Sequence, residues 1–164
     1  MDRFKIRAAS PSDAKDICAM AAELSAHEGQ PDPPFDTSQF KRFGFGKEQR
    51  FFSLVADFKK SLIGYVLFCD SFHVGTGTPG LLMLDLFVKR NYRSMGVARS
   101  LMACLSKECM NRGGTWVTWQ CQPGNEIALE FYQKLGGRRF AAIDFELAGA
   151  ALKKLANGNQ EFPC

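Results

Sequence analysis

The stretch from residue 81 to residue 111 constrains the fold of this chain more than any other. Leu81–Val88 is a short apolar run of the kind that forms a buried strand. Asn91–Gly96 breaks that pattern and predicts a turn. Val97–Asn111 then carries apolar side chains at intervals of four, which is the inward stripe of an amphipathic helix. Connections of the strand–helix–strand type predict a mixed sheet with helices on both of its faces.

The same patterns predict elements on both sides of this stretch. Strands are expected at 4–8, 51–58, 62–70, 115–121 and 139–147, and helices from the cap at 10–13, at 37–45 and at 125–135. The second and third strands form a hairpin that turns through Lys59-Lys60-Ser61. Residues 71–80 are rich in Gly, Thr and Pro and predict a loop.

Length and composition indicate a globular protein. The chain has 164 residues, 46% hydrophobic and 23% charged, which suits one packed domain. We therefore expect a single domain over residues 1–156 and a loose tail over 157–164. The longest apolar runs, such as Leu62–Cys69, are far shorter than the roughly 20 residues needed to cross a bilayer. We expect no membrane partner.

Charge and cysteine usage narrow the class further. A net charge of +4 suits an anionic ligand, but no basic face interleaved with aromatic residues predicts nucleic-acid binding. The six cysteines are irregularly spaced, and the first residues read as structure rather than as a secretory signal, which predicts reduced thiols and a cytoplasmic protein. There is no Cys-x-x-Cys pair, and His27 and His73 are remote from the cysteines, so no metal is expected.

The start of the helix at Val97 has the composition of an anion site. Backbone N–H groups in the first turn of a helix have no helical acceptor, and the helix dipole favours negative charge there. Gly96 allows close approach to the backbone, and Arg93 adds a cation. The residues alone leave two interpretations open: a phosphate site, or an ordinary helix cap with one packing glycine.

Two spaced motifs give a more specific interpretation. Arg93-x-x-Gly96-x-Ala98, after a strand that ends Leu86-Phe87-Val88, resembles the acetyl-CoA signature of the GCN5-related N-acetyltransferases (GNAT). Downstream, a second block resembles the Asn-x-x-Ala-x-x-Phe-Tyr-x-x-x-Gly helix of that superfamily: Asn125, Ala128, Phe131, Tyr132 and Gly136. The resemblance covers nearly the whole chain.

Within the superfamily the chain most resembles the diamine acetyltransferases, which act on spermidine, spermine and thialysine. The likeness rests on Phe4–Ala9, on Met83–Arg93 and on Trp119-Gln120 followed by Asn125. The sequence differs from them in two places. Leu84 stands where those enzymes have an amine-contacting glutamate, and Pro123-Gly124 stands where they have Asp-Trp.

The resemblance implies the GNAT fold, an α/β (α+β) arrangement. Its central sheet is mixed and mostly antiparallel, with six to seven strands, helices on both faces and two strands that splay at the acetyl-CoA site. It implies an enzyme, an acetyl-CoA-dependent N-acetyltransferase that acetylates a primary amine of a small molecule by direct attack in a ternary complex, and a homodimer. Two alternatives stay open: acetylation of a protein or peptide amine, and a non-catalytic CoA-binding sensor domain.

The resemblance also assigns residues to the donor side. The pantetheine arm is expected along the strand edge and the phosphates at the helix start, with further contacts from the downstream helix: Leu86, Phe87, Val88, Arg93, Ser94, Met95, Gly96, Val97, Ala98, Arg99, Asn125 and Ala128. Tyr132 is the expected catalytic acid. A phenol with a pKa of about 10 is protonated at neutral pH and can donate to a leaving thiolate.

The acceptor side is less determined. Asp85 is close to the expected position of a base, but regular alternation would point it away from the face of Leu84. A β-bulge could re-aim it, and a purely structural carboxylate is the alternative. His27 and Glu28 follow the first helix, where the family gathers its substrate. An ordinary surface pair is the alternative for them.

Overall fold

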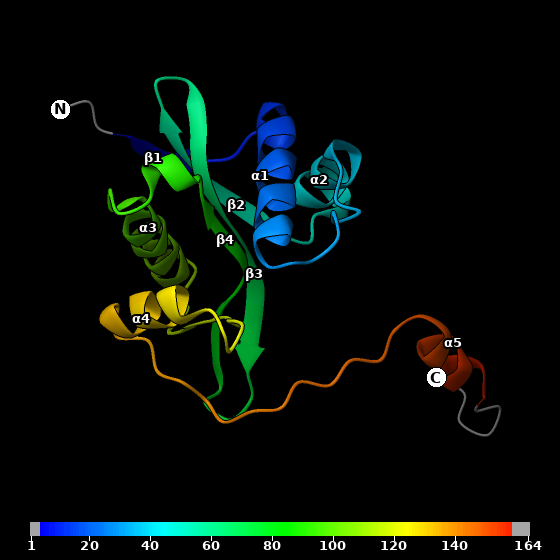
Figure 1. The fold of residues 1–164 in the computed structure, drawn as a ribbon. Helices are drawn as coiled ribbons and strands as arrows, with labels where there is room; N and C mark the ends of the chain where they lie inside the picture. Colours follow the sequence, from blue (N-terminus) through cyan, green and yellow to red (C-terminus); the bar gives the residue numbers. More distant parts are fainter. Residues whose placement is uncertain (1–3, 159–164) are drawn as a thin grey trace. The chain divides into compact units, whose positions relative to one another are not determined.

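A five-stranded sheet in the order β1-β2-β3-β4-β5 forms the centre of this computed structural model, which describes residues 4–158 (Figure 1). The first four strands pair antiparallel, and β5 pairs parallel with β4. The elements up to Asn125 are β1 (Lys5–Ala8), η1 (Pro11–Asp13), α1 (Ala14–His27), α2 (Thr37–Gly44), η2 (Gly46–Glu48), β2 (Phe52–Phe58), β3 (Ser61–His73), β4 (Thr78–Val88), η3 (Arg90–Tyr92), α3 (Val97–Asn111) and β5 (Val117–Thr118).

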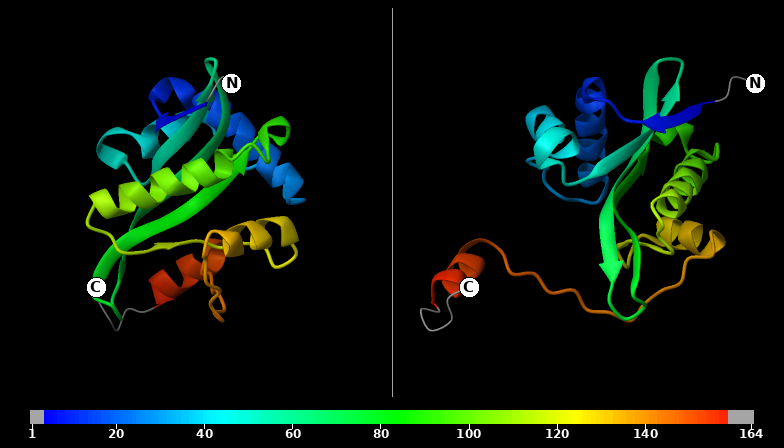
Figure 2. Two further views of the ribbon diagram at one scale, coloured as in Figure 1. Left: turned by 90° about the vertical axis from the view of Figure 1, so that its left-hand side faces the viewer. Right: turned by 180° about the vertical axis from the view of Figure 1, so that it is seen from behind.

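Helices cover both faces of this sheet, as the sequence predicts. In Figures 1 and 2, α1 and α2 lie on one side of the strands and α3 lies on the other. Under α1 and α2 the core joins Ile17 and Phe40 to the sheet residues Tyr65, Leu67 and Phe87. The predicted stripe of α3 is buried on the opposite face: Val97, Leu101, Leu105 and Cys109. Each fully buried side chain of this size contributes about 1.5–3 kcal/mol.

A β-bulge in β4 sets the direction of the residues after it. Phe68 pairs with Met83, whereas the preceding Leu67 pairs with Asp85, so Leu84 is an extra residue without a partner on β3. Residues opposite each other in a ladder share a face, and neighbours along a strand alternate. Met83 therefore faces α3, while Asp85 and Phe87 face α1 and α2. The bulge that could re-aim Asp85 is present.

The structure has two hairpins, β2–β3 and β3–β4. The turn of the first lies where it is predicted, and the loop of the second is shorter than predicted. Lys59 and Lys60 form the predicted turn between β2 and β3, both with positive φ (51° and 66°). The predicted loop over 71–80 is too long, because β3 continues to His73 and β4 already begins at Thr78. Strand pairing between the two long strands extends over residues whose Gly, Thr and Pro content suggests a loop.

The described chain divides into two compact units with a border between Asn125 and Glu126. The second unit contains α4 (Glu126–Lys134) and α5 (Gly149–Gly158). This division does not test the single domain expected over 1–156, which remains a prediction. Asn157 and Gly158 belong to α5 rather than to a loose tail, and the rest of that predicted tail, 159–164, lies outside the described residues.

One strand prediction is wrong in extent, and another is wrong altogether. The strand expected at 115–121 is only Val117–Thr118, and the one expected at 139–147 is absent from the described residues of the second unit. Phe140, Ile143 and Phe145 remain largely exposed. Alternating apolar side chains favour a strand, but a strand also needs a neighbour for its backbone hydrogen bonds. Within residues 4–158 the sheet therefore has five strands instead of six to seven.

Candidate active site

The parallel strands β4 and β5 separate soon after they pair. Their ladder consists of Leu81 opposite Val117 and Leu82 opposite Thr118. From Met83 to Val88, no strand within residues 4–158 pairs with that side of β4. The predicted splay is therefore present, and the predicted donor edge Leu86–Val88 lies beyond it.

The turn between β4 and α3 is shaped by backbone geometry. Ser94 and Gly96 both have positive φ, 63° and 80°, and Gly96 is the residue that caps α3. Nothing lies within 4 Å of a Cβ built on Gly96, so its left-handed backbone rather than local crowding favours glycine there. The N–H groups of the first turn, from Val97 to Arg99, are the ones predicted to bind an anion, and this role remains a prediction.

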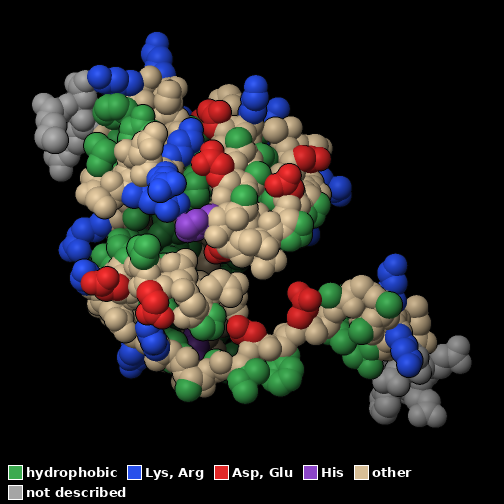
Figure 3. All heavy atoms as spheres, in the orientation of Figure 1, with side chains coloured by type: hydrophobic (Ala, Val, Ile, Leu, Met, Phe, Trp, Pro, Cys, Tyr) green, Lys and Arg blue, Asp and Glu red, His purple; other side chains and the backbone are tan. Residues whose placement is uncertain are grey.

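Arg93 fixes this turn to the end of the strand. Its Nε donates to the carbonyl of Val88 at 3.0 Å, and its guanidinium lies 5.7 Å from the ring centroid of Phe87. The cation expected at the site thus also has a structural role. Arg90 and Arg99 are exposed nearby in sequence. In Figure 3, Lys and Arg side chains (blue) gather on the side where β4 runs into η3, which favours an anionic ligand.

Asp85 lies just before the donor edge, on the α1 face. It accepts a short hydrogen bond from the hydroxyl of Tyr65 and another from the backbone N–H of Leu86. Burial, together with the like charge of Glu28, raises the pKa of Asp85 to about 6, although the Tyr65 hydrogen bond opposes that shift. A carboxylate with a pKa near neutrality is well suited to act as a general base.

A pocket of about 370 Å³ brings three predicted site residues together. Its lining is polar apart from one glycine: His27, Glu28, Gln30, Gln122, Gly124 and Asn125. The end of α1 supplies the first group, where the N–H of Glu28 donates to the carbonyl of Leu24 at 3.0 Å. The segment after β5 supplies the second, where the N–H of Asn125 donates to the carbonyl of Gln122 at 3.0 Å.

Two predicted residues belong to the second unit. Ala128 and Tyr132 lie on α4, where the Tyr132 ring is 5.2 Å from that of Phe131 between centroids. The geometry of the first unit leaves their predicted roles untested, and both remain predictions.

The sequence analysis does not single out Tyr65, the hydrogen-bond partner of Asp85. Tyr65 lies in the apolar run Leu62–Cys69, for which the sequence predicts only a strand. A signal was available, because a hydroxyl on an otherwise apolar buried strand needs a hydrogen-bond partner. Gln30 and Gln122 were also missed, and nothing in the sequence distinguishes them from ordinary loop glutamines.

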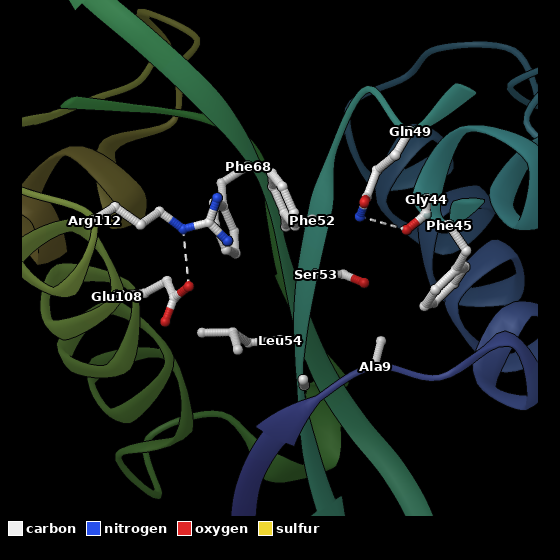
Figure 4. A pocket seen from close by; sticks show the side chains of 11 residues that line it. Ala9, Gly44, Phe45, Gln49, Phe52, Ser53, Leu54, Phe68, Glu108 and Arg112 are labelled. Atoms are coloured by element: carbon white, nitrogen blue, oxygen red, sulfur yellow. Dashed lines mark hydrogen bonds and ion pairs between the residues drawn. The ribbon is translucent and has the colours of Figure 1, made fainter. Parts of the chain in front are cut away.

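A second pocket, of about 220 Å³, lies where β2 extends past the end of β1 (Figure 4). Its guanidinium, from Arg112, stacks 3.9 Å from the centroid of Phe52 and donates to Glu108 and to Asp70. Gln49 on the other side of β2 donates to the carbonyl of Gly44. The charged groups here neutralise one another, and none of the predicted site residues lines this pocket.

Within residues 4–158, no group of three or more His, Cys, Asp or Glu side chains could hold a metal ion. None of the helices described is long and apolar enough to cross a bilayer.

A mixed sheet whose parallel strands separate beside a glycine-capped helix start defines the class of proteins with the GNAT fold. The chain belongs to the acetyltransferase (GNAT) family, which it matches over residues 17–137. The family and the fold class predicted from the sequence are therefore confirmed.

The relatives that the chain matches differ in the acceptor group that their names state. The chain is 32% identical over 92 residues to N-alpha-acetyltransferase 30 of Schizosaccharomyces pombe, a match to 56% of this chain and 61% of that protein. It is 24% identical over 161 residues to the thialysine N-epsilon-acetyltransferase of Caenorhabditis elegans, covering 96% and 99%. The chain thus spans less than two thirds of the first relative and nearly all of the second.

The fold is also found among solved structures. An integron cassette protein from the mobile metagenome of V. cholerae superimposes with a TM-score of 0.79, covering 96% of this chain and 99% of that one. The two are 19% identical, so this likeness concerns the fold alone.

Proposed function

We propose that this protein transfers the acetyl group of acetyl-CoA to a primary amine of a small polar molecule. The observation that carries the proposal is Asp85, a carboxylate with a pKa of about 6 that the bulge in β4 points to the α1 face, next to the free strand edge. Such a base is matched to removing a proton from an ammonium group near neutral pH.

The proposed reaction has one bond-forming step. The neutral amine attacks the thioester carbonyl carbon, so a C–N bond forms as the C–S bond breaks. The proton of the amine passes to Asp85, directly or through a water. The thiolate of CoA leaves and takes a proton, for which Tyr132 is the proposed donor. No metal or redox partner is needed for this balance.

The donor is proposed to lie along β4 and at the start of α3. Backbone groups of Leu86–Val88 would pair with the pantetheine arm on the side that β5 leaves open. The first turn of α3, after Gly96, would hold the phosphates through N–H groups and the dipole of the helix. Asn125 and Ala128 complete the proposed donor contacts.

The acceptor is proposed to enter by the polar pocket. Glu28 contributes a carboxylate to its lining, and no Lys or Arg among residues 4–158 lines it. Asp85 is a second carboxylate, close enough to Glu28 for the charge of Glu28 to raise its pKa. An ammonium group is attracted to such a site. Leu84 is 50% exposed and supplies no further negative charge, which favours an acceptor less highly charged than spermidine.

A peptide amine is the second candidate, supported by the likeness to N-alpha-acetyltransferase 30 of Schizosaccharomyces pombe. The homodimer implied by the resemblance and the cytoplasmic location predicted from the cysteines belong to the proposed function as well. Sedimentation of the purified protein checks the first of them.

An acceptor screen tests the proposed function. Purified protein and acetyl-CoA are incubated with polyamines, thialysine and other lysine analogues, aminoglycosides and N-terminal peptides, and release of free thiol is followed. We expect a small mono- or diamine to give the highest kcat/KM and spermidine a lower one. A peptide as the best acceptor would move the assignment to the second candidate. Binding of CoA without thiol release from any acceptor would contradict an enzyme.

Gly96→Val provides the control for the donor site. A valine is strained at a φ of 80°, and its side chain would obstruct approach to the first turn of α3. We expect acetyl-CoA affinity, measured by calorimetry on the folded variant, to fall at least about tenfold. Unchanged affinity would remove the phosphates from this turn.

A further inference from the structure

Tyr65 is a buried phenol whose hydroxyl is committed to one partner. Its side chain is 0% exposed and belongs to the core under α1 and α2. The hydroxyl donates to Oδ2 of Asp85. A phenylalanine would fill the same apolar space, so packing alone does not require the hydroxyl.

The bulge at Leu84 is what allows the two side chains to meet. Tyr65 pairs with Phe87, and its second neighbour Leu67 pairs with Asp85. Tyr65 and Asp85 are therefore diagonal neighbours on one face, a separation that a long aromatic side chain can bridge. With regular alternation from Met83, Asp85 would point to the α3 face, and the hydroxyl would have no carboxylate to reach.

The groups around Asp85 show how the Tyr65 hydroxyl affects its ionisation. On one side is the phenol from β3, on another the carboxylate of Glu28 at the end of α1, and the backbone N–H of Leu86 is the remaining donor. No Lys or Arg among the described residues acts on this carboxylate. Burial and Glu28 both oppose its ionisation, so the two neutral donors are what favours the charged form.

Tyr65 itself keeps its proton under all relevant conditions. Burial, followed by the charge of Asp85, raises the pKa of Tyr65 far above its usual value, and the charge of Glu28 acts in the same direction. The phenol is therefore a permanent donor and no acid or base in its own right. Its influence on any reaction has to pass through Asp85.

We propose that Tyr65 is a positioning residue for acetyl transfer: its hydroxyl holds Asp85 ionised and aimed at the end of α1, ready to accept the proton of the acceptor amine. This inference rests on the proposed function, since it assigns a task to Tyr65 only if Asp85 is the base. It distinguishes Tyr65 from its neighbours Leu67 and Phe87, which pack on the same face and have no donor.

The pH profile of Tyr65→Phe tests the proposal. The acid limb of kcat/KM reports the base of the free enzyme. Without the hydroxyl, the charged form of Asp85 loses a donor, and we expect the limb to move up by about one pH unit. Activity would then fall about tenfold on the limb and return to near the wild-type value at pH 8.5 to 9. A purely structural tyrosine would lower activity equally at all pH values, which would overturn the proposal.

Two further variants keep the test decisive. Site-specific 3-fluorotyrosine at position 65 retains the ring and strengthens the donor, so the limb should move down instead. In the background of Asp85→Asn, Tyr65→Phe should have no further effect on kcat, because the residue through which it acts is gone. Additive losses in the double variant would contradict a role that passes through Asp85.

A measurement without turnover separates this inference from the proposed function. Carbon NMR of the aspartate carboxyls gives the pKa of Asp85 directly in the wild type and in Tyr65→Phe. A raised value in the variant supports the hydrogen bond even if no acceptor is found, in which case the proposed function alone fails. An unchanged value with an active enzyme rejects Tyr65 as the residue that holds Asp85.

Discussion

Two aspartates of the first unit, Asp13 and Asp85, have pKa values shifted in opposite directions from the ordinary value. Asp13, at the corner between β1 and α1, accepts two hydrogen bonds from the guanidinium of Arg7, at 2.8 and 2.9 Å, and one from the N–H of Ser10 at 2.7 Å. Hydrogen bonding to Arg7, opposed by burial, lowers the pKa of Asp13 to about 2. In the centre of the sheet, burial raises that of Asp85 to about 6.

The difference lies in the partners rather than in the depth of burial alone. Asp13 is only 8% exposed, yet a bidentate cation keeps it charged. Asp85 has neutral donors and a like charge nearby, so its proton is lost only near neutrality. Asp13, which is ion-paired with Arg7, stabilises a corner. Asp85, whose donors are neutral, is suited to the proposed proton transfer.

The largest effect is expected from Asp85→Asn. Loss of a general base costs about 10²–10⁴-fold, so kcat for the best acceptor should fall at least about 100-fold. Asp13→Asn, measured on folded protein under the same single-turnover conditions, should leave kcat within a factor of two or so of the wild type. Retained activity in Asp85→Asn would show that the base lies elsewhere.

A smaller effect, on stability, is expected from Asp13→Asn. The free energy of unfolding at pH 7, from urea titration, should fall by about 2 kcal/mol because Arg7 loses its bidentate partner. The folded pKa of Asp13 is depressed, so its contribution is present above pH 3.8 and is lost as pH falls through about 2. The two proteins should therefore converge near pH 2. A constant difference across this range would contradict the ion pair as its cause.

The smallest effect concerns Asp85 and has the opposite sign. Its folded pKa is raised, so its contribution to stability is fully present below pH 3.8 and is lost as pH rises through about 6. Relative to Asp85→Asn, the wild type should lose ~1–2 kcal/mol of unfolding free energy between pH 3.8 and 6, a value reduced by partial contact with solvent. Parallel stability curves for the two proteins would remove the raised pKa.

The fold was predictable from sequence wherever side-chain periodicity decides it. The bounds of α3 agree with the prediction to the residue, because its apolar stripe at intervals of four ends at Gly113-Gly114. The hairpin at Lys59-Lys60 is also confirmed. The expected strand at 139–147 is wrong, since the alternation of Ile143 and Phe145 describes one segment and says nothing of a partner.

The candidate site was predictable in part for the same reason. Motif spacing predicts donor-side roles for Gly96 and the β4 edge, which remain predictions. The sequence also singles out His27 and Glu28 after the first helix, and both line the polar pocket. The partner of Asp85 could not be predicted, because the meeting of Tyr65 with Asp85 depends on one unpaired residue in a ladder between strands. Helix α5 was missed as well, since its Gly149 start lacks a recognisable cap.

The extra residue in β4 acts as a phase shift in the strand. Before Leu84, odd-numbered residues such as Leu81 and Met83 serve one layer of the protein; after it, odd-numbered residues serve the other. One strand therefore contributes to two cores and lets a charged side chain emerge at the junction between them. Deletion of one residue there would turn every side chain from Asp85 to Val88 to the opposite face of the sheet. The proposed base is thus specified by the count of residues along β4 as much as by their identity.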